Sequence, residues 1–104
     1  MFIQIDLSSN GASIQDVRTL TEFEIRSQEI NAEQTSSLIG GGSYVKDESH
    51  VWVSINWILE NIKEEVNDDW NMEFNKMIAY AKTKGWVNEK ETHLQAHIEP
   101  TGWP

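Results

Sequence analysis

The residues best suited to acid–base chemistry lie together in the short segment Asp47-Glu48-Ser49-His50. A carboxylate next to an imidazole can orient the histidine and stabilise its charged form, so His50 is the candidate base and Asp47 or Glu48 its partner. Ser49 lacks the Gly-x-Ser-x-Gly elbow of a hydrolase. The alternative interpretation, which the sequence favours, is a polar turn that leads into the following strand.

The other two histidines, His93 and His97, are compatible with a metal site only in one conformation. On a helix they would share a face one turn apart, and His50 or Glu99 would complete the ligands. On a strand their Cα atoms lie roughly 13 Å apart, at about 3.3 Å per residue, which is too far for one metal ion. The intervening Leu-Gln-Ala also lacks the glutamate of a zinc protease. The favoured interpretation is a row of exposed polar positions, and no metal or other cofactor is predicted.

Three consecutive glycines, Gly40 to Gly42, form the next candidate site. Backbone N–H groups in such a loop can surround a phosphate. A Walker loop would end in Lys and Ser or Thr, whereas Ser43-Tyr44-Val45-Lys46 follows here, and the dinucleotide-binding fingerprint has a different glycine spacing. The loop is therefore interpreted as a flexible connector or a lid.

Tryptophan is unusually frequent, and each indole adds a large apolar surface and one N–H donor. The five tryptophans are Trp52, Trp57, Trp70, Trp86 and Trp103. Trp70 lies on a helical apolar stripe and is assigned to the core. Trp52 shares a strand face with His50, so Trp52, Tyr44 and Trp57 are the candidate lining of a ligand pocket. Core packing is the alternative for these residues.

Strands are predicted where apolar and polar residues alternate or where β-branched residues cluster. The first two, Phe2–Leu7 and Thr19–Ile30, are expected to form an antiparallel pair. Two further strands are predicted at Ser43–Lys46 and His50–Val53. The segment from His93 to Glu99 alternates like a strand, but Asn88 followed by Glu91 resembles a helix capping box. The strand is the favoured interpretation.

Helices are predicted between these strands. A helical turn is expected at Ala32–Ile39, and a short one is expected to open at Ser13. Ser54 is suited to cap a helix from Ile55 to about Val66. The clearest helix is Asp69–Lys84, where apolar residues recur at helical spacing, acidic residues stand at the start, and lysines and Gly85 stand at the end. Together these elements predict an α+β fold, with a small antiparallel or mixed sheet and two or three helices packed on one face.

Size and charge limit the classes of function. The chain has 104 residues, no cysteine and a formal net charge of −9. One domain is expected over 1–104, with 100–104 as a tail. Direct binding to nucleic acid or to an anionic membrane is disfavoured, because both need a basic surface. The absence of cysteine, of a signal peptide and of a long apolar run is consistent with a cytoplasmic location.

Two functions from different classes are compatible with these observations. The first, which is slightly favoured, is a regulatory module of the inhibitor, immunity or antitoxin kind that binds a basic protein. Its contact face would be the acidic set Glu64, Glu65, Asp68, Asp69 and Glu73. The second is a small-molecule-binding protein or a small cofactor-independent enzyme with a Trp/His-lined pocket. A third hypothesis is a homodimer joined through edge strands and Trp103. The sequence does not decide whether the chain is an enzyme.

Overall fold

A mixed sheet of six strands forms the centre of the molecule, in the order β2-β1-β3-β6-β5-β4. The computed structural model describes residues 1–28 and 31–100. The strands are β1 (Phe2–Asp6), β2 (Gly11–Gln15), β3 (Glu24–Ser27), β4 (Tyr44–Asp47), β5 (His50–Ser54) and β6 (His93–Pro100). The helices are α1 (Ala32–Ile39), α2 (Ile55–Glu60) and α3 (Asp68–Thr83). The predicted α+β class is confirmed, with a sheet larger than the small one expected.

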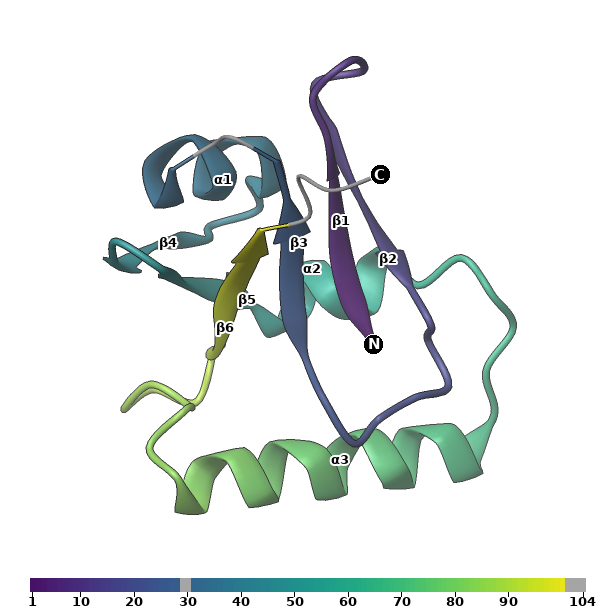
Figure 1. Ribbon diagram of the computed structural model, residues 1–104. Coiled ribbons are helices and arrows are strands. Elements are labelled where there is room, and N and C mark those ends of the chain that lie inside the picture. The colour runs from purple at the N-terminus through teal and green to yellow at the C-terminus, as the bar shows by residue number, and fades with distance from the viewer. Residues whose placement is uncertain (29–30, 101–104) are drawn as a thin grey trace.

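Strands β1, β3 and β6 are parallel to one another, whereas the pairs β1–β2, β4–β5 and β5–β6 are antiparallel (Figure 1). The predicted antiparallel pairing of the first strand with the segment after Thr19 is therefore wrong. The turn that ends at Gly11 sends the chain straight back, so residues 11–15 pair with β1 instead of opening a helical turn at Ser13. The segment after Thr19 contributes only β3, which joins β1 in parallel.

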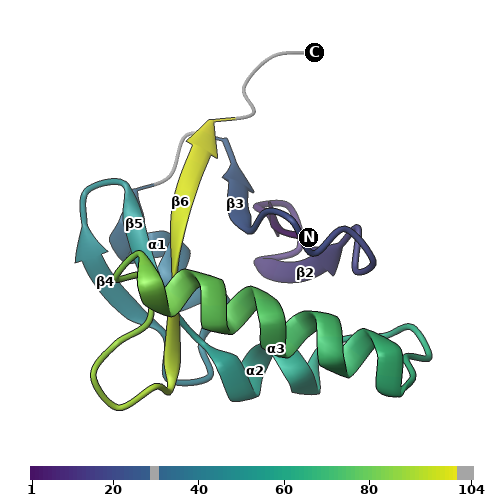
Figure 2. The same ribbon diagram turned by 90° about the horizontal axis from the view of Figure 1, so that it is seen from below.

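The sheet curves around α1 and the hydrophobic core. Helix α1 contacts β4 and β5 at one end of the sheet and also β1 and β2 at the other. Figures 1 and 2 show α1 and α2 on the same side of the strands. Alternate strand residues point to this side and are buried; they include Ile3, Ile5, Ile25, Val51, Val53, Leu94 and Ala96. We call the opposite side of the sheet, which no helix of the described chain covers, the outer face.

Helix α3 spans Asp68–Thr83, close to its predicted bounds, and runs across the ends of the strands on the side where β1 begins (Figure 1). Asn67 caps it, because its side chain accepts a hydrogen bond from the Trp70 N–H. Trp70 stacks on Phe74 with ring centroids 5.1 Å apart, and its indole N–H donates to the Val17 carbonyl oxygen at 2.8 Å. Trp70 is therefore a core residue that attaches α3 to the β2–β3 connection.

The structure also decides where the second predicted helix ends and whether the C-terminal segment is a strand. The helix that begins after Ser54 ends at Glu60 and not near Val66, because Asn61 turns its side-chain amide back onto the Trp57 carbonyl oxygen at 2.8 Å. The predicted C-terminal strand is confirmed as β6. Asn88 does not open a helix, since its side-chain oxygen accepts from the N–H groups of Thr92 and His93 and closes a turn. Ile30 and Trp103 lie outside the described residues.

None of the helices in ranges 1–28 and 31–100 has both the length and the apolarity that a membrane-spanning segment needs.

Candidate functional site

The predicted chemical residues gather on the outer face, where β4, β5 and β6 lie side by side. Val51 and Val53 of β5 are buried. His50 and Trp52 alternate with them along the strand and therefore point outward. The strand register places Asp47 opposite His50, and His50 opposite His97. Two residues further along the strands, Tyr44 and Trp52 are partners in the same way. The outer face thus carries a histidine row and, next to it, an aromatic row.

Asp47 and His50, two of the residues predicted as acid–base groups, are hydrogen-bonded to each other. The Nδ1 atom of His50 lies 2.8 Å from an Asp47 carboxylate oxygen, which also accepts from the Ser49 N–H at 3.0 Å. The hydrogen bond to His50, followed by that to Ser49, lowers the pKa of Asp47 to about 2. Glu48, the other candidate partner, is exposed and has no hydrogen-bonding partner in the part of the chain that the structure describes. Asp47 is therefore the residue that orients His50.

The lowered pKa of Asp47 predicts a pH effect on stability. Its folded value lies below the ordinary 3.8, so the ionised carboxylate stabilises the fold above about pH 4, and this contribution is lost as the pH falls through about 2. Asp47→Asn should lower the melting temperature slightly at pH 5, and the difference from wild type should shrink toward pH 2. Glu48→Gln, which removes a neighbouring exposed carboxylate that does not contact His50, is the matched control. Parallel curves for Asp47→Asn and wild type over this range would contradict the prediction.

His97 was not predicted to belong to this cluster, yet its ring lies 5.0 Å from that of His50, centroid to centroid. Its Nε2 atom is 3.2 Å from a Glu99 carboxylate oxygen. His93, four residues earlier on the same strand, lies away from this pair and contacts Tyr44. The described residues contain no group of three His, Asp or Glu side chains arranged to hold a metal ion.

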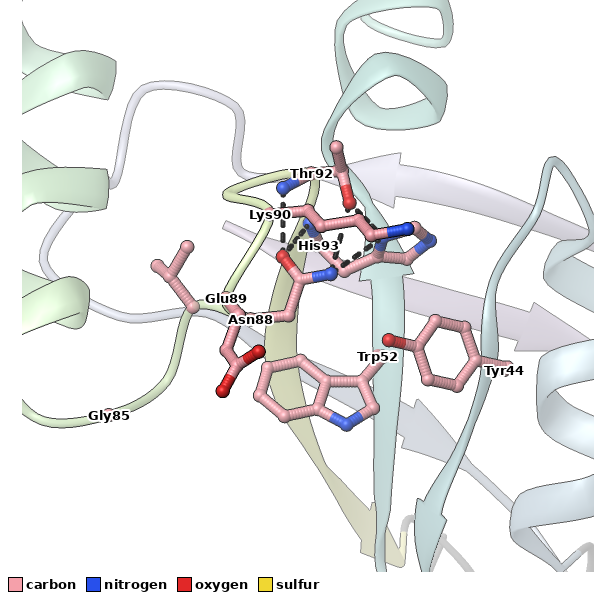
Figure 3. A pocket seen from close by; sticks show the side chains of 9 residues that line it. Tyr44, Trp52, Gly85, Asn88, Glu89, Lys90, Thr92 and His93 are labelled. Atoms are coloured by element: carbon pink, nitrogen blue, oxygen red, sulfur yellow. Dashed lines mark hydrogen bonds between the residues drawn. The ribbon is translucent and has the colours of Figure 1, made fainter.

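An open cavity of about 610 Å³ lies over the aromatic row. Its lining includes Tyr44 of β4, Trp52 of β5 and His93 of β6, and the Tyr44 and His93 rings are 4.9 Å apart. The 85–92 segment supplies the opposite wall, with Asn88 and Glu89 facing Trp52 in Figure 3. Two predicted lining residues, Tyr44 and Trp52, therefore meet at one cavity.

Hydrogen bonds fix the walls of this cavity. The Asn88 side chain accepts from the Thr92 and His93 N–H groups and donates to the Thr92 hydroxyl oxygen at 3.0 Å (Figure 3). His93 Nε2 lies 2.8 Å from the Gly42 carbonyl oxygen, which can only accept, so this nitrogen carries the proton. The histidine therefore links β6 to the glycine loop and holds its ring against Tyr44.

Trp57, the third predicted lining residue, is not among the residues that line this cavity. It packs under Gly41, where a Cβ atom would lie only 2.5 Å from Trp57 Cδ1. The glycine loop is closed by hydrogen bonds from the Gly40 N–H to Ser36 and from the Ser43 N–H to Gly40. The loop is thus a hydrogen-bonded connection between α1 and β4, in which Gly41 and Gly42 are exposed.

The predicted acidic face is exposed and lies at the α2–α3 connection and the start of α3. Its members are Glu64, Glu65, Asp68, Asp69 and Glu73. Arg18 pairs with Glu64 at 3.5 Å and donates to the Glu65 carbonyl oxygen at 3.0 Å. Asp68 and Asp69 stand in the first turn of α3, where negative charge stabilises the helix dipole. Part of this acidic set therefore has a local structural role.

Comparison of the chain with known protein families, curated proteins and solved structures gave no match.

Proposed function

We propose that the protein binds a small molecule with a planar ring in the cavity over Trp52, Tyr44 and His93. The observation that carries this proposal is the convergence of three rings from three adjacent strands on one cavity of about 610 Å³. Binding sites for small molecules are concave, mostly apolar and supplied with a few fixed polar groups, and they reach about this size. The cavity is open to solvent, but it has about this volume, its lining is mostly apolar, and Asn88 and His93 are polar side chains held in place by hydrogen bonds.

The walls also suggest which ligands fit. Trp52 is half-buried and Tyr44 is exposed, so both rings offer apolar surface that a planar ligand can cover. Glu89 and Lys90, both exposed, stand on the opposite wall with charges of opposite sign. The side chain of Asn88 is already engaged in closing its turn. We expect a flat ligand that bears a carboxylate or an amine, whose charge pairs with Lys90 or Glu89.

Fragment binding observed by ¹H–¹⁵N NMR tests this function. A panel of aromatic carboxylates and aromatic amines should shift the amide signals of β5 and of the 85–92 segment. Trp52→Ala should weaken the binding of the best fragment at least tenfold, which corresponds to about 1.4 kcal/mol. Trp86→Ala is the matched control, because Trp86 is exposed and does not line the cavity. Fragments that shift only other regions, or that bind Trp52→Ala unchanged, would rule out this cavity as the site.

Docking of a basic protein on the acidic set is the second candidate function. The observation in its favour is that all five acidic side chains are exposed at one end of α3 and its preceding connection. Such a surface speeds association with a basic partner and makes binding sensitive to salt.

A lysine-rich peptide is a direct probe of this acidic surface. Neutralising Glu64, Glu65, Asp68, Asp69 and Glu73 to their amides should abolish salt-dependent binding of the peptide. The control is a variant with five other exposed glutamates neutralised, which has the same net charge: Glu22, Glu33, Glu48, Glu60 and Glu89. Equal losses in the two variants would mean that overall charge, and not this surface, attracts the peptide.

A further inference from the structure

His50 and His97 belong to neighbouring antiparallel strands and are direct register partners. The Ile98 N–H donates to the Ser49 carbonyl oxygen at 2.8 Å, so the adjacent pair of residues carries the ladder hydrogen bond. Because hydrogen-bonded and non-hydrogen-bonded pairs alternate, His50 and His97 form a non-hydrogen-bonded pair, the kind whose side chains approach most closely. Their ring centroids are 5.0 Å apart, and the ring planes are tilted by 57°.

Each imidazole has its own carboxylate, on a different ring nitrogen. Asp47 contacts His50 at Nδ1, and Glu99 contacts His97 at Nε2. A carboxylate holds the proton on the nitrogen that it contacts and leaves the other nitrogen as the basic one. The hydrogen bond to Asp47 therefore leaves Nε2 as the basic nitrogen of His50; on His97 the nitrogen that faces away from Glu99 is Nδ1, and Glu99 pairs with this ring at ion-pair distance without a hydrogen bond. Neither of these two nitrogens has a hydrogen-bonding partner within residues 1–28 and 31–100.

A third carboxylate, Glu24, is the register partner of His97 on β3, but its charge is already paired. Arg26 Nε lies 3.0 Å from a Glu24 carboxylate oxygen, and its guanidinium covers the Phe2 ring at 3.7 Å from the centroid. Arg26 thus neutralises Glu24 and keeps its side chain in place. The His50–His97 pair is left with one dedicated carboxylate for each ring.

Both rings remain open to solvent, since the side chain of His50 is 27% exposed and that of His97 is 46% exposed. Two basic nitrogens on rings this close can reach two oxygens that are bonded to the same carbon. Hydrolysis of an ester is accelerated when a base takes a proton from the attacking water and an acid protonates the oxygen that leaves.

We propose that His50 and His97 are a catalytic pair that hydrolyses small carboxylic esters. His50 Nε2 takes a proton from a water molecule as its oxygen forms a bond to the carbonyl carbon. His97, in its protonated form, delivers a proton to the alcohol oxygen as the bond from carbon to that oxygen breaks. One water is consumed, and an acid and an alcohol are released. The proton gained by His50 and the proton lost by His97 are exchanged with solvent, which restores the pair.

Hydrolysis of phenyl acetate, whose leaving oxygen is basic enough to need protonation, by the intact chain tests the pair. The wild-type rate should exceed that of free imidazole at the same histidine concentration at least tenfold. His50→Gln, His97→Gln and the double variant should each lose most of this excess, because the two residues act as a unit and their effects are not additive. Gln15→Ala, at the far end of the same outer face, should keep the wild-type rate within twofold. A rate equal to that of free imidazole, or losses that multiply in the double variant, would overturn the proposal.

A second measurement uses the wild-type chain alone and does not depend on the folding of any variant. Long-range ¹H–¹⁵N correlations report which ring nitrogen is protonated in the neutral histidine. His50 should be protonated at Nδ1, the nitrogen that donates to Asp47, and protonation at Nε2 instead would contradict its role as the base. His50 lies two residues from Trp52 along β5, outside the aromatic cavity. The acetyl group of the ester has no ring that would have to bind in that cavity. Failure of ligand binding at Trp52 would therefore leave these two tests unaffected.

Discussion

Replacing Trp70 by alanine is expected to lower the free energy of unfolding by about 3–5 kcal/mol, the usual cost of removing a large aromatic side chain from a core. Trp70 is only 5% exposed, stacks on Phe74 and donates a hydrogen bond to the Val17 carbonyl oxygen. The substitution leaves a cavity and an unpaired carbonyl group between α3 and the β2–β3 connection. Urea denaturation at neutral pH measures the loss.

Two further variants separate the contributions of this residue. Trp70→Phe keeps an aromatic ring but removes the indole N–H, and should cost about 1–3 kcal/mol because the Val17 carbonyl oxygen loses its donor. Trp86→Ala removes an indole that is 41% exposed and meets only the edge of Tyr80 in a ring contact, so its cost should be well below that of Trp70→Ala. Equal losses for Trp70→Ala and Trp86→Ala would show that α3 does not depend on this anchor.

Gly41→Ala should destabilise the fold by about 2–4 kcal/mol, through backbone strain together with crowding against the half-buried Trp57 side chain. Gly41 has φ of +60°, in the left-handed region that residues with a Cβ atom avoid. The added Cβ would also lie 2.5 Å from Trp57 Cδ1, so the indole must move. Thermal denaturation of the variant gives the size of the effect.

Gly42→Ala is the matched control for this position. Gly42 has φ of +87°, but no atom lies within 4 Å of where its Cβ would be, so only the backbone strain applies and the cost should be about 1–2 kcal/mol. If both variants lose the same stability, the close approach of Gly41 to Trp57 does not contribute.

Local patterns were enough to predict α3, β5 and the alternation of β6. In α3 the stripe through Trp70 and Phe74, the acidic first turn and Gly85 all indicate the same helix, and the structure has it at Asp68–Thr83. The proximity of Asp47 to His50 also follows from local sequence, because the two flank a tight turn between β4 and β5. Side chains that meet within one hairpin can be deduced from the order of residues.

Contacts between distant segments could not be predicted in this way. His97 meets His50 only because β6 pairs with β5 in one register, and a shift of one residue would turn His97 toward the core. Trp57 looked like a lining residue because indoles often line pockets. Its place under Gly41 depends instead on how the α1–β4 loop packs against α2. The mixed sheet order likewise depends on which strands pair across the whole chain, and alternation along one strand does not specify its neighbours.

The central position of β6 sets the order in which the sheet can be assembled. Strands β1, β2 and β3 form one ladder and the β4–β5 hairpin another, and within the described residues only β6 hydrogen-bonds to both. Among the described strands β6 is synthesised last, so the inner edges of the two ladders stay unpaired until residues 93–100 have been made. Pairing across such long stretches of chain slows folding. A chain stalled before His93 would expose the inner edges of β3 and β5 together, and these are the edges through which incomplete copies would associate.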